Sequence, residues 1–286
     1  MEDNKKQANR ISLHKFDSWS LELMNKPYKF DKWACGQVGE NNEGVYREGY
    51  QNLPVKDNGE ELVSCSDYGL VSKDYYLNVF LDEVKQKSDL LMPLLQNKQL
   101  FPFAWVRQTV AQRLMKVDMF LRSHDLLLVV NSGWRDVGVQ GIIKELMSGE
   151  FGKDYVERAI AAAPKGGSSV TPHATGGACD LELWSLQTNN PLSYSYPGDV
   201  INSFVLEQKE NVDELEMTKK KIRRILFHLL TEPGYCLAGD EVFTVHPGEF
   251  WHFGDGDPLS AYLKRFEYAK YGYIRPNANY KFHGNE

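Results

Sequence analysis

The sequence predicts an α+β protein in which a small sheet is flanked by helices. Apolar residues recur at helical spacing over 105–123, as is typical of an amphipathic helix. A continuous apolar run, 126–130, has the length and composition of a buried strand. Apolar and polar residues then alternate over 178–184, which indicates a second strand. Helices and strands are thus both expected in the fold.

Length and composition indicate an ordinary globular protein. The chain has 286 residues, enough for one large domain or two small ones, with 42% hydrophobic and 25% charged residues. Its net charge of −6 argues against nucleic acid or an anionic membrane as a partner. No apolar run approaches the ~20 residues that span a bilayer, and no signal-peptide core follows the polar start. We therefore expect a cytoplasmic location, or a periplasmic one if a leader was removed.

The first hundred residues have poor periodicity and many aromatic side chains. Helical spacing appears only at 72–91, and Pro93 should end or kink that helix. We expect 1–286 to form a single domain. Within it, 1–100 would be an irregular N-terminal extension wrapped on a core of 101–275.

The core segment is expected to contain both helices and strands. The expected helices are 105–123, 137–147, 153–163 and one that begins in the charge-rich run 207–221, and the expected strands are 125–131, 178–184 and 242–245. Pro233 should end the last helix.

A motif for metal binding occupies 171–180, which reads T-x-H-x-x-G-x-A-x-D and leads into an alternating strand. Pro172 and the two glycines of this motif break a helix, so His173 is expected in a loop. Asp180 is expected at the mouth of the strand. The glycines allow a tight backbone in which both side chains can converge.

A second stretch, 249–252, reads E-x-W-H and is expected to be extended or bulged. Together, His173, Asp180 and His252 match catalytic zinc, which typically takes three protein ligands and leaves the fourth position to water. Glu249 stands beside this set as a candidate proton carrier. The H-E-x-x-H zinc helix is absent, so the architecture must be a different one.

Each candidate also has a purely structural interpretation. A histidine and an aspartate near a turn can form a cap, and Glu249 can be a solvated acid. Arg135, at the end of a buried strand, can pair with Asp136 or Glu145. Asp199 can cap the N-terminus of a helix.

The two motifs resemble those of the zinc D-alanyl-D-alanine dipeptidases, the VanX-type branch of the D,D-peptidase family. That family has S-x-H-x-x-G-x-A-x-D followed by E-x-W-H, and Thr171 here supplies a hydroxyl in place of the serine. The segment 253–257 and the pair Tyr271-Gly272 are also similar to the family. The resemblance covers roughly 105–273. It implies a hedgehog/D,D-peptidase-like fold with a mostly antiparallel sheet.

The resemblance also implies a cofactor and catalytic roles. One Zn²⁺ per chain would be held by His173, Asp180 and His252, with Glu249 as the general base that activates water. Arg135 stands where the family's G-Y-R element has an arginine that reaches the scissile carbonyl, although a tryptophan replaces the tyrosine here.

Three further residues take substrate-binding roles by the same resemblance: Thr171, Trp251 and Asp199. Trp251 would pack beneath the metal. Asp199 is nineteen residues after Asp180, where the family has an aspartate that binds the free amino end of a dipeptide. The family's M-G-x-x-F-D surroundings are not kept at this position. His246 has no match in the motif and is not assigned as a ligand.

The function expected from the resemblance is zinc-dependent hydrolysis of D,D-dipeptides, D-Ala-D-Ala above all, in a bacterium. The sequence does not distinguish roles in cell-wall recycling, resistance and nutrition. The chain would then be a single catalytic domain with a zinc peptidase core at 101–275. Two alternatives remain: a zinc D,D-carboxypeptidase acting on peptidoglycan stem peptides, and a zinc-binding module without turnover. The expected partner is a small D-amino-acid peptide.

Overall fold

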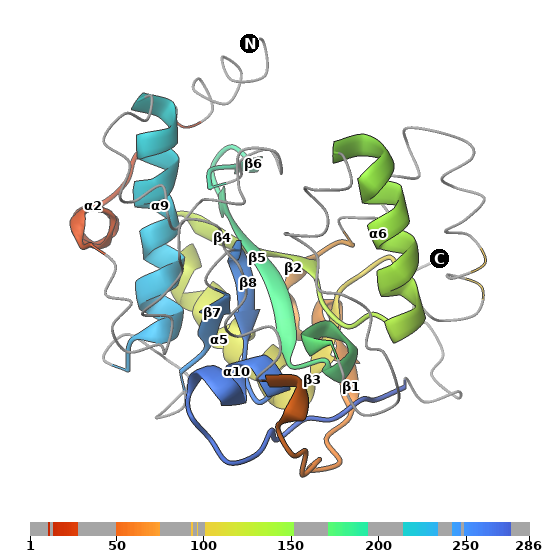
Figure 1. The fold of residues 1–286 in the computed structure, drawn as a ribbon. Coiled ribbons are helices and arrows are strands. Elements are labelled where there is room, and N and C mark those ends of the chain that lie inside the picture. Colours follow the sequence, from red (N-terminus) through yellow and green to blue (C-terminus); the bar gives the residue numbers. More distant parts are fainter. Residues whose placement is uncertain are drawn as a thin grey trace.

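The computed structural model describes residues 11, 14–27, 50–74, 93, 96, 101–151, 171–193, 214–233, 242–246 and 249–275. These residues form helices around a mixed sheet, which confirms the expected α+β fold (Figure 1). The described helices are α2 (Ser18–Asn25), η2 (Tyr50–Asn52), η3 (Cys65–Tyr68), α5 (Gln108–Arg122), α6 (Val137–Phe151), η4 (Pro172–Thr175), α9 (Glu214–Thr231) and α10 (Pro258–Leu263). The described strands are β1 (Leu62–Ser64), β2 (Val71–Ser72), β3 (Trp105–Arg107), β4 (Leu126–Ser132), β5 (Ala178–Ser185), β6 (Asn190–Pro191), β7 (Thr244–His246) and β8 (Glu249–Gly254).

The larger sheet has the strand order β2–β4–β5–β8–β7, and β6 pairs with β5 outside this path. β2 and β4 are parallel, whereas the remaining pairs of this sheet in the described ranges are antiparallel. The expected small, mostly antiparallel sheet is therefore confirmed. β1 and β3 form a separate antiparallel pair.

The main hydrophobic core lies on one face of the larger sheet. Alternate residues of β4 and β5, including Leu128 and Leu181, are buried in it. α5 and α9 add apolar side chains such as Leu114 and Ile225 to the same cluster. Figure 1 shows α9 and α6 on opposite sides of the view, with the sheet between them. The sheet face away from this core carries the polar residues considered next.

The helix expected over 105–123 starts three residues late, because 105–107 form strand β3. Leu62 of β1 pairs with Arg107 in an antiparallel register, so the ladder with β1 takes up this backbone. Arg107 is fully buried at the junction between β3 and α5. Apolar spacing could not reveal this, since Trp105 and Val106 fit a helical stripe as well as a strand.

Part of the N-terminal segment contacts the core directly. β2 forms an edge of the larger sheet, and β1 pairs with β3. α2 lies against α9, where the guanidinium of Arg224 donates to the carbonyl of Met24 over 3.0 Å. Ser72, where a helix was expected to begin, belongs to β2, and 75–92 lie outside the described residues.

Several other expectations cannot be compared with the structure. The helix expected at 153–163 and the residue Asp199 lie outside the described residues. Of the charge-rich run 207–221, the part from Glu214 onward is helical, as expected, in α9. Within the described ranges, every helix is too short or too polar to cross a bilayer.

Candidate metal centre

His173 lies on a single turn of 3₁₀ helix, η4, rather than in the loop expected from the sequence. Pro172 stands in the first turn, where a fixed φ and a missing N–H are tolerated. Gly176 ends the turn at φ 72°, and its amide donates to the carbonyl of His173. The positive φ favours glycine at this position, and a Cβ there would also lie 2.4 Å from Cδ2 of Leu62, which would have to shift.

Asp180 and His252 are directly opposite each other on adjacent antiparallel strands. β5 and β8 pair in the register Cys179↔Phe253 and Asp180↔His252. Because side chains alternate along a strand, Cys179 and Phe253 face the hydrophobic core while Asp180 and His252 share the other face. β5 begins at Ala178, so Asp180 is near the start of its strand, as expected.

Strand β8 is extended with an irregularity, which matches the expectation of an extended or bulged stretch. The register of β7 with β8 shifts between Val245 and His246, so residues 250–252 lie between two rungs of this ladder. Such extra residues bend and twist a strand. As a result, His252 has no partner residue in β7 within this ladder and pairs instead with Asp180 of β5.

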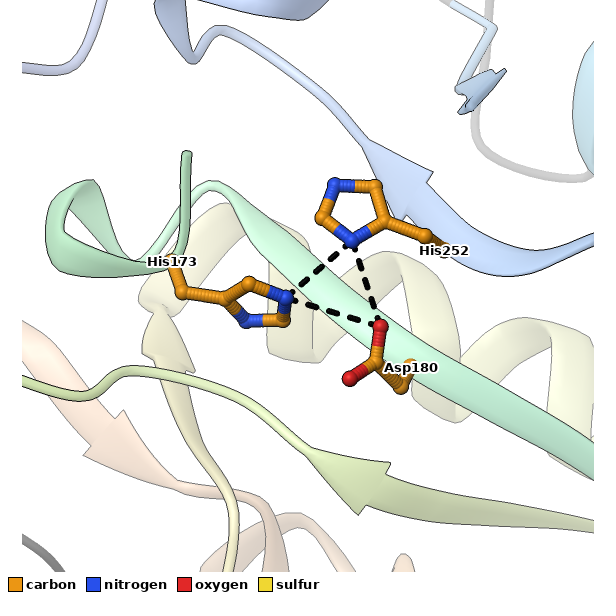
Figure 2. A group of neighbouring side chains, drawn as sticks. All are labelled: His173, Asp180 and His252. Atoms are coloured by element: carbon orange, nitrogen blue, oxygen red, sulfur yellow. Dashed lines mark hydrogen bonds and ion pairs between the residues drawn. The ribbon is translucent and has the colours of Figure 1, made fainter. Parts of the chain in front are cut away.

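The three candidate ligands come together at one buried point (Figure 2). Nε2 of His173 is 3.1 Å from Nδ1 of His252 and 3.5 Å from Oδ1 of Asp180, and Nδ1 of His252 is 3.2 Å from the same oxygen. Ligand atoms at about 2.0–2.2 Å from a tetrahedral zinc are separated from one another by about 3.3–3.6 Å. The three separations are therefore close to those of one face of a coordination tetrahedron, with two of them slightly shorter.

The tautomer of His173 is set by the backbone. Its Nδ1 is 2.8 Å from the carbonyl oxygen of Gly133, which can only accept a hydrogen bond, so Nδ1 carries the proton and donates it. Burial, and then the charge of Arg135, lowers the pKa of His173 to about 4. The imidazole is thus neutral at pH 7 and presents the lone pair of Nε2 to the centre, as a metal ligand must.

Asp180 is ionised in this environment. Burial acts to raise the pKa of its carboxyl group, but the imidazoles of His173 and His252 outweigh this and hold the pKa below its usual value. A proton on Nδ1 of His252 can be donated either to Nε2 of His173 or to Oδ1 of Asp180, but not to both. At least two of the three atoms therefore face each other as acceptors without a proton between them. Oδ1 of Asp180 is buried without a hydrogen-bond donor among the described residues. A cation between the three atoms would remove this repulsion, so the residues fit a bound metal.

Arg135 lies beside this centre, and two of its contacts are to polar side chains of neighbouring residues. Its Nε donates to Oε1 of Gln140 over 2.9 Å, and its Nη1 donates to Oγ of Ser132 over 3.1 Å. Its charge acts on His173. The guanidinium is buried, with 5% of the residue exposed.

Three residues position His173 through contacts that were not predicted from the sequence. Gly133 provides the carbonyl that accepts from His173. Nε1 of Trp134 lies 3.2 Å from the carbonyl of Ala174, inside the η4 turn. Nε of Arg107 donates to the carbonyl of Thr175 over 2.7 Å. The signal available in the sequence was the Ser-Gly-Trp-Arg segment after a buried strand, but its contacts with η4 are non-local.

The remaining candidates are less completely described. Glu249 opens β8, three residues before His252, and its side chain lies outside the described part. Thr171 precedes η4, and its Oγ1 is buried without a hydrogen-bond partner among the described residues. Trp251 is half-buried and packs against the hydrophobic core. The ring of His246 is 5.7 Å from that of His252, and His246 is not in the buried group of possible ligands.

Comparisons with known proteins give little further information. No family model matches the chain, and no curated protein matches it. Among solved structures, one similar chain comes from work titled "Structure of the LdcB LD-carboxypeptidase reveals the molecular basis of peptidoglycan recognition". It is 14% identical, with a TM-score of 0.29 over 57% of this chain and 70% of that chain. Such a TM-score does not assign a fold or an activity.

Proposed function

We propose that this chain is a zinc-dependent peptidase that hydrolyses D,D-dipeptides, with D-Ala-D-Ala as its substrate. The observation that carries the proposal is the buried trio of His173 Nε2, Asp180 Oδ1 and His252 Nδ1 at 3.1–3.5 Å from one another. The motifs that deliver this trio resemble those of the dipeptidases, with Thr171 in place of the family's serine.

Zinc is the metal that this donor set favours. Two imidazole nitrogens and one carboxylate oxygen suit Zn²⁺, whereas Mg²⁺ and Ca²⁺ prefer a shell of oxygen atoms. Three protein ligands leave one position of a tetrahedron for water or substrate, which is the pattern of catalytic rather than structural sites. Bound there, zinc would supply a Lewis acid and make water a nucleophile near neutral pH.

Proton transfer is assigned to Glu249. In β8 it precedes the ligand His252 by three residues, as in the family's E-x-W-H motif. As general base it would accept a proton from the attacking water and then pass this proton to the leaving amine. General acid–base catalysis of this kind typically contributes 10²–10⁴-fold to the rate.

Arg135 is assigned to the scissile carbonyl. Gln140 and Ser132 orient its guanidinium beside the candidate metal centre. A donor directed at a developing oxyanion in a site without water typically contributes roughly 3–4 kcal/mol. Thr171, Trp251 and Asp199 are proposed as further contacts to a small D-amino-acid peptide.

The test is hydrolysis of D-Ala-D-Ala and of an acylated tripeptide ending in D-Ala-D-Ala, with and without a chelator. We expect turnover of the dipeptide alone, loss of turnover with chelator, and recovery on adding zinc. Equal turnover of both peptides would instead identify a D,D-carboxypeptidase. One bound zinc without turnover of either peptide would identify a zinc-binding module.

The role of Glu249 can be tested with two glutamine variants. Glu249→Gln should lower kcat at least a hundredfold while one zinc per chain remains bound. Glu267→Gln is the control. Glu267 is an exposed acid that follows α10 in the chain, and its replacement should leave kcat unchanged. If Glu249→Gln keeps wild-type kcat, Glu249 is not the base.

A further inference from the structure

His246 is a half-buried histidine to which the proposed function gives no role. It ends β7 and pairs in an antiparallel register with Glu249, the first residue of β8. Directly opposite residues in such a pair have Cβ atoms about 4.5–5.5 Å apart, close enough for their side chains to interact. The pairing of the two strands therefore brings an imidazole to the residue that is assigned as general base.

The ring of His246 lies on the side of the metal centre. Its centroid is 5.7 Å from that of the His252 ring, and the two planes are inclined by 74°, which is an edge-to-face contact. The preceding residue, Val245, is buried in the hydrophobic core. Because side chains alternate along a strand, His246 points away from that core. His246 thus contacts a candidate ligand and stands opposite the candidate base.

The irregularity of β8 produces this arrangement. Residues 250–252 have no partner in β7, because the register shifts between Val245 and His246. Continued regularly from Val245, the same ladder would pair His246 with His252. The shift sets Glu249 opposite His246 instead, while the ring of His252 stays within contact.

The chemistry of an imidazole suits a partner of Glu249 rather than a further metal ligand. Among the described residues, the buried group of possible ligands consists of His173, Asp180 and His252, without His246. An imidazole has an N–H donor in both its neutral and its protonated form, whereas an ionised carboxylate only accepts. A glutamate side chain is long and loses much rotamer freedom when it is fixed. A carboxylate that acts as base must nevertheless stay within hydrogen-bond reach of the water.

We propose that His246 is a positioning residue for Glu249, whose carboxylate accepts a hydrogen bond from the imidazole and is thereby held toward the open position of the metal centre. This inference rests on the proposed function, in which Glu249 is the general base. The role does not require His246 to change its charge, since an N–H is present in either state. Partners of this kind typically contribute about 10–100-fold to metal affinity or activity. Here the loss should fall on kcat, because the metal ligands are unchanged.

Two variants separate the hydrogen bond from the ring contact. His246→Phe keeps a ring against His252 and removes the N–H, whereas His246→Gln removes the ring and keeps an N–H donor. His246→Phe should lower kcat for D-Ala-D-Ala about tenfold or more, with KM and zinc content unchanged, and His246→Gln should keep kcat within about threefold of wild type. In a Glu249→Gln background, His246→Phe should lower kcat no further, because the two residues act as a unit.

His124→Gln is the matched control. His124 is a half-buried histidine that precedes β4 and pairs with Asp17, and its replacement should leave kcat unchanged. The inference would be overturned if His246→Phe kept wild-type kcat, if His246→Gln lost as much as His246→Phe, or if either variant lost its zinc. A further drop caused by His246→Phe in the Glu249→Gln background would also overturn it.

A crystal structure of the zinc-free chain tests the contact independently of activity. We expect a ring nitrogen of His246 within about 3.2 Å of a carboxylate oxygen of Glu249. A larger separation would overturn the inference. Failure of the wild-type chain to hydrolyse D-Ala-D-Ala or the acylated tripeptide would refute the proposed function instead, and the measured distance would still decide whether His246 holds Glu249.

Discussion

His173 depends on one backbone carbonyl for its tautomer and its direction. That carbonyl belongs to Gly133, whose position is itself fixed by contact with the backbone of Trp105. The residue types of the candidate metal centre are visible in the sequence, because the full string T-x-H-x-x-G-x-A-x-D followed by E-x-W-H is specific. The hydrogen bond that directs Nε2 at the centre is not visible, since it joins residues forty positions apart in the chain.

At this scale we predict that Gly133→Ala weakens both the fold and the metal site. A Cβ at Gly133 would lie 2.3 Å from the carbonyl oxygen of Trp105, and a backbone atom cannot move aside cheaply. The free energy of unfolding should fall by about 1–3 kcal/mol, and zinc affinity about tenfold or more. Denaturant unfolding and zinc titration measure these effects.

Gly141→Ala is the matched control for that variant. Gly141 lies within α6, and a Cβ there would meet nothing within 4 Å. Alanine in a helix interior is favoured over glycine by up to about 1 kcal/mol. This control should therefore be at least as stable as wild type with unchanged zinc affinity. Equal behaviour of the two variants would contradict the role given to Gly133.

Among elements, the η4 turn and the irregular strand β8 bring the ligands together. The sequence predicted a strand for Asp180 and an extended stretch for His252, because strand alternation and turn residues are local signals. The pairing of Asp180 with His252 was not predictable, since register depends on where β8 departs from β7. The predicted start of α5 at residue 105 was wrong for a similar reason. Residues 105–107 pair with β1, and this pairing overrides their helical spacing.

The segment between η2 and β1 supports η4 indirectly through Asp57 and Glu60. Arg107, which donates to the carbonyl of Thr175 in η4, also contacts this segment. Asp57 pairs with Arg107 over 2.7 Å, and Glu60 accepts from the amide of Thr109 and the hydroxyl of Tyr271. Burial acts to raise the pKa of both acids, but hydrogen bonds outweigh it and lower the pKa of each. For Asp57 these come first from the amides of Gly59 and Gly272 and then from Arg107, and for Glu60 first from Thr109.

Acid should therefore loosen this tie. Carboxylates whose folded pKa is lowered stabilise the fold fully above their ordinary values of 3.8 and 4.5, and this contribution is lost as pH falls through the lowered values. The free energy of unfolding of the wild-type chain should drop from pH 6 to pH 3. The Glu60→Gln variant should be less stable than wild type at pH 6, and its free energy of unfolding should drop less over the same range. An unchanged slope in Glu60→Gln would contradict this assignment.

At the scale of the whole molecule, the N-terminal segment contributes strands β1 and β2 to the two sheets. It also provides Asp57, which pairs with the buried Arg107. Its boundary near residue 100 remains a prediction. We expect the fragment 101–286 to lack a cooperative thermal transition, because it would lose β1 and β2 and leave Arg107 without Asp57. The full chain should unfold in one transition. A fragment that unfolds cooperatively would show that 1–100 is dispensable.

The fold class was predictable because helical spacing and strand alternation are strong over 108–132 and 178–185. Much of the N-terminal segment was not, since irregular segments held by single contacts such as Asp57 with Arg107 have no period. Glu182 illustrates the same limit. In the sequence it is one polar residue of an alternating strand, and only the structure shows that the face it points to is buried.

The most direct test of the account is a titration of Zn²⁺ into chelator-treated protein, followed by calorimetry. We predict one ion per chain with Kd below about 1 µM, the affinity that corresponds to roughly 8 kcal/mol. His252→Ala should weaken binding at least a hundredfold, while His246→Ala, which alters the neighbouring ring, should retain one tightly bound ion. Absence of zinc binding by the wild-type chain, or equal binding by His252→Ala, would contradict the central claim that His173, Asp180 and His252 form a metal centre.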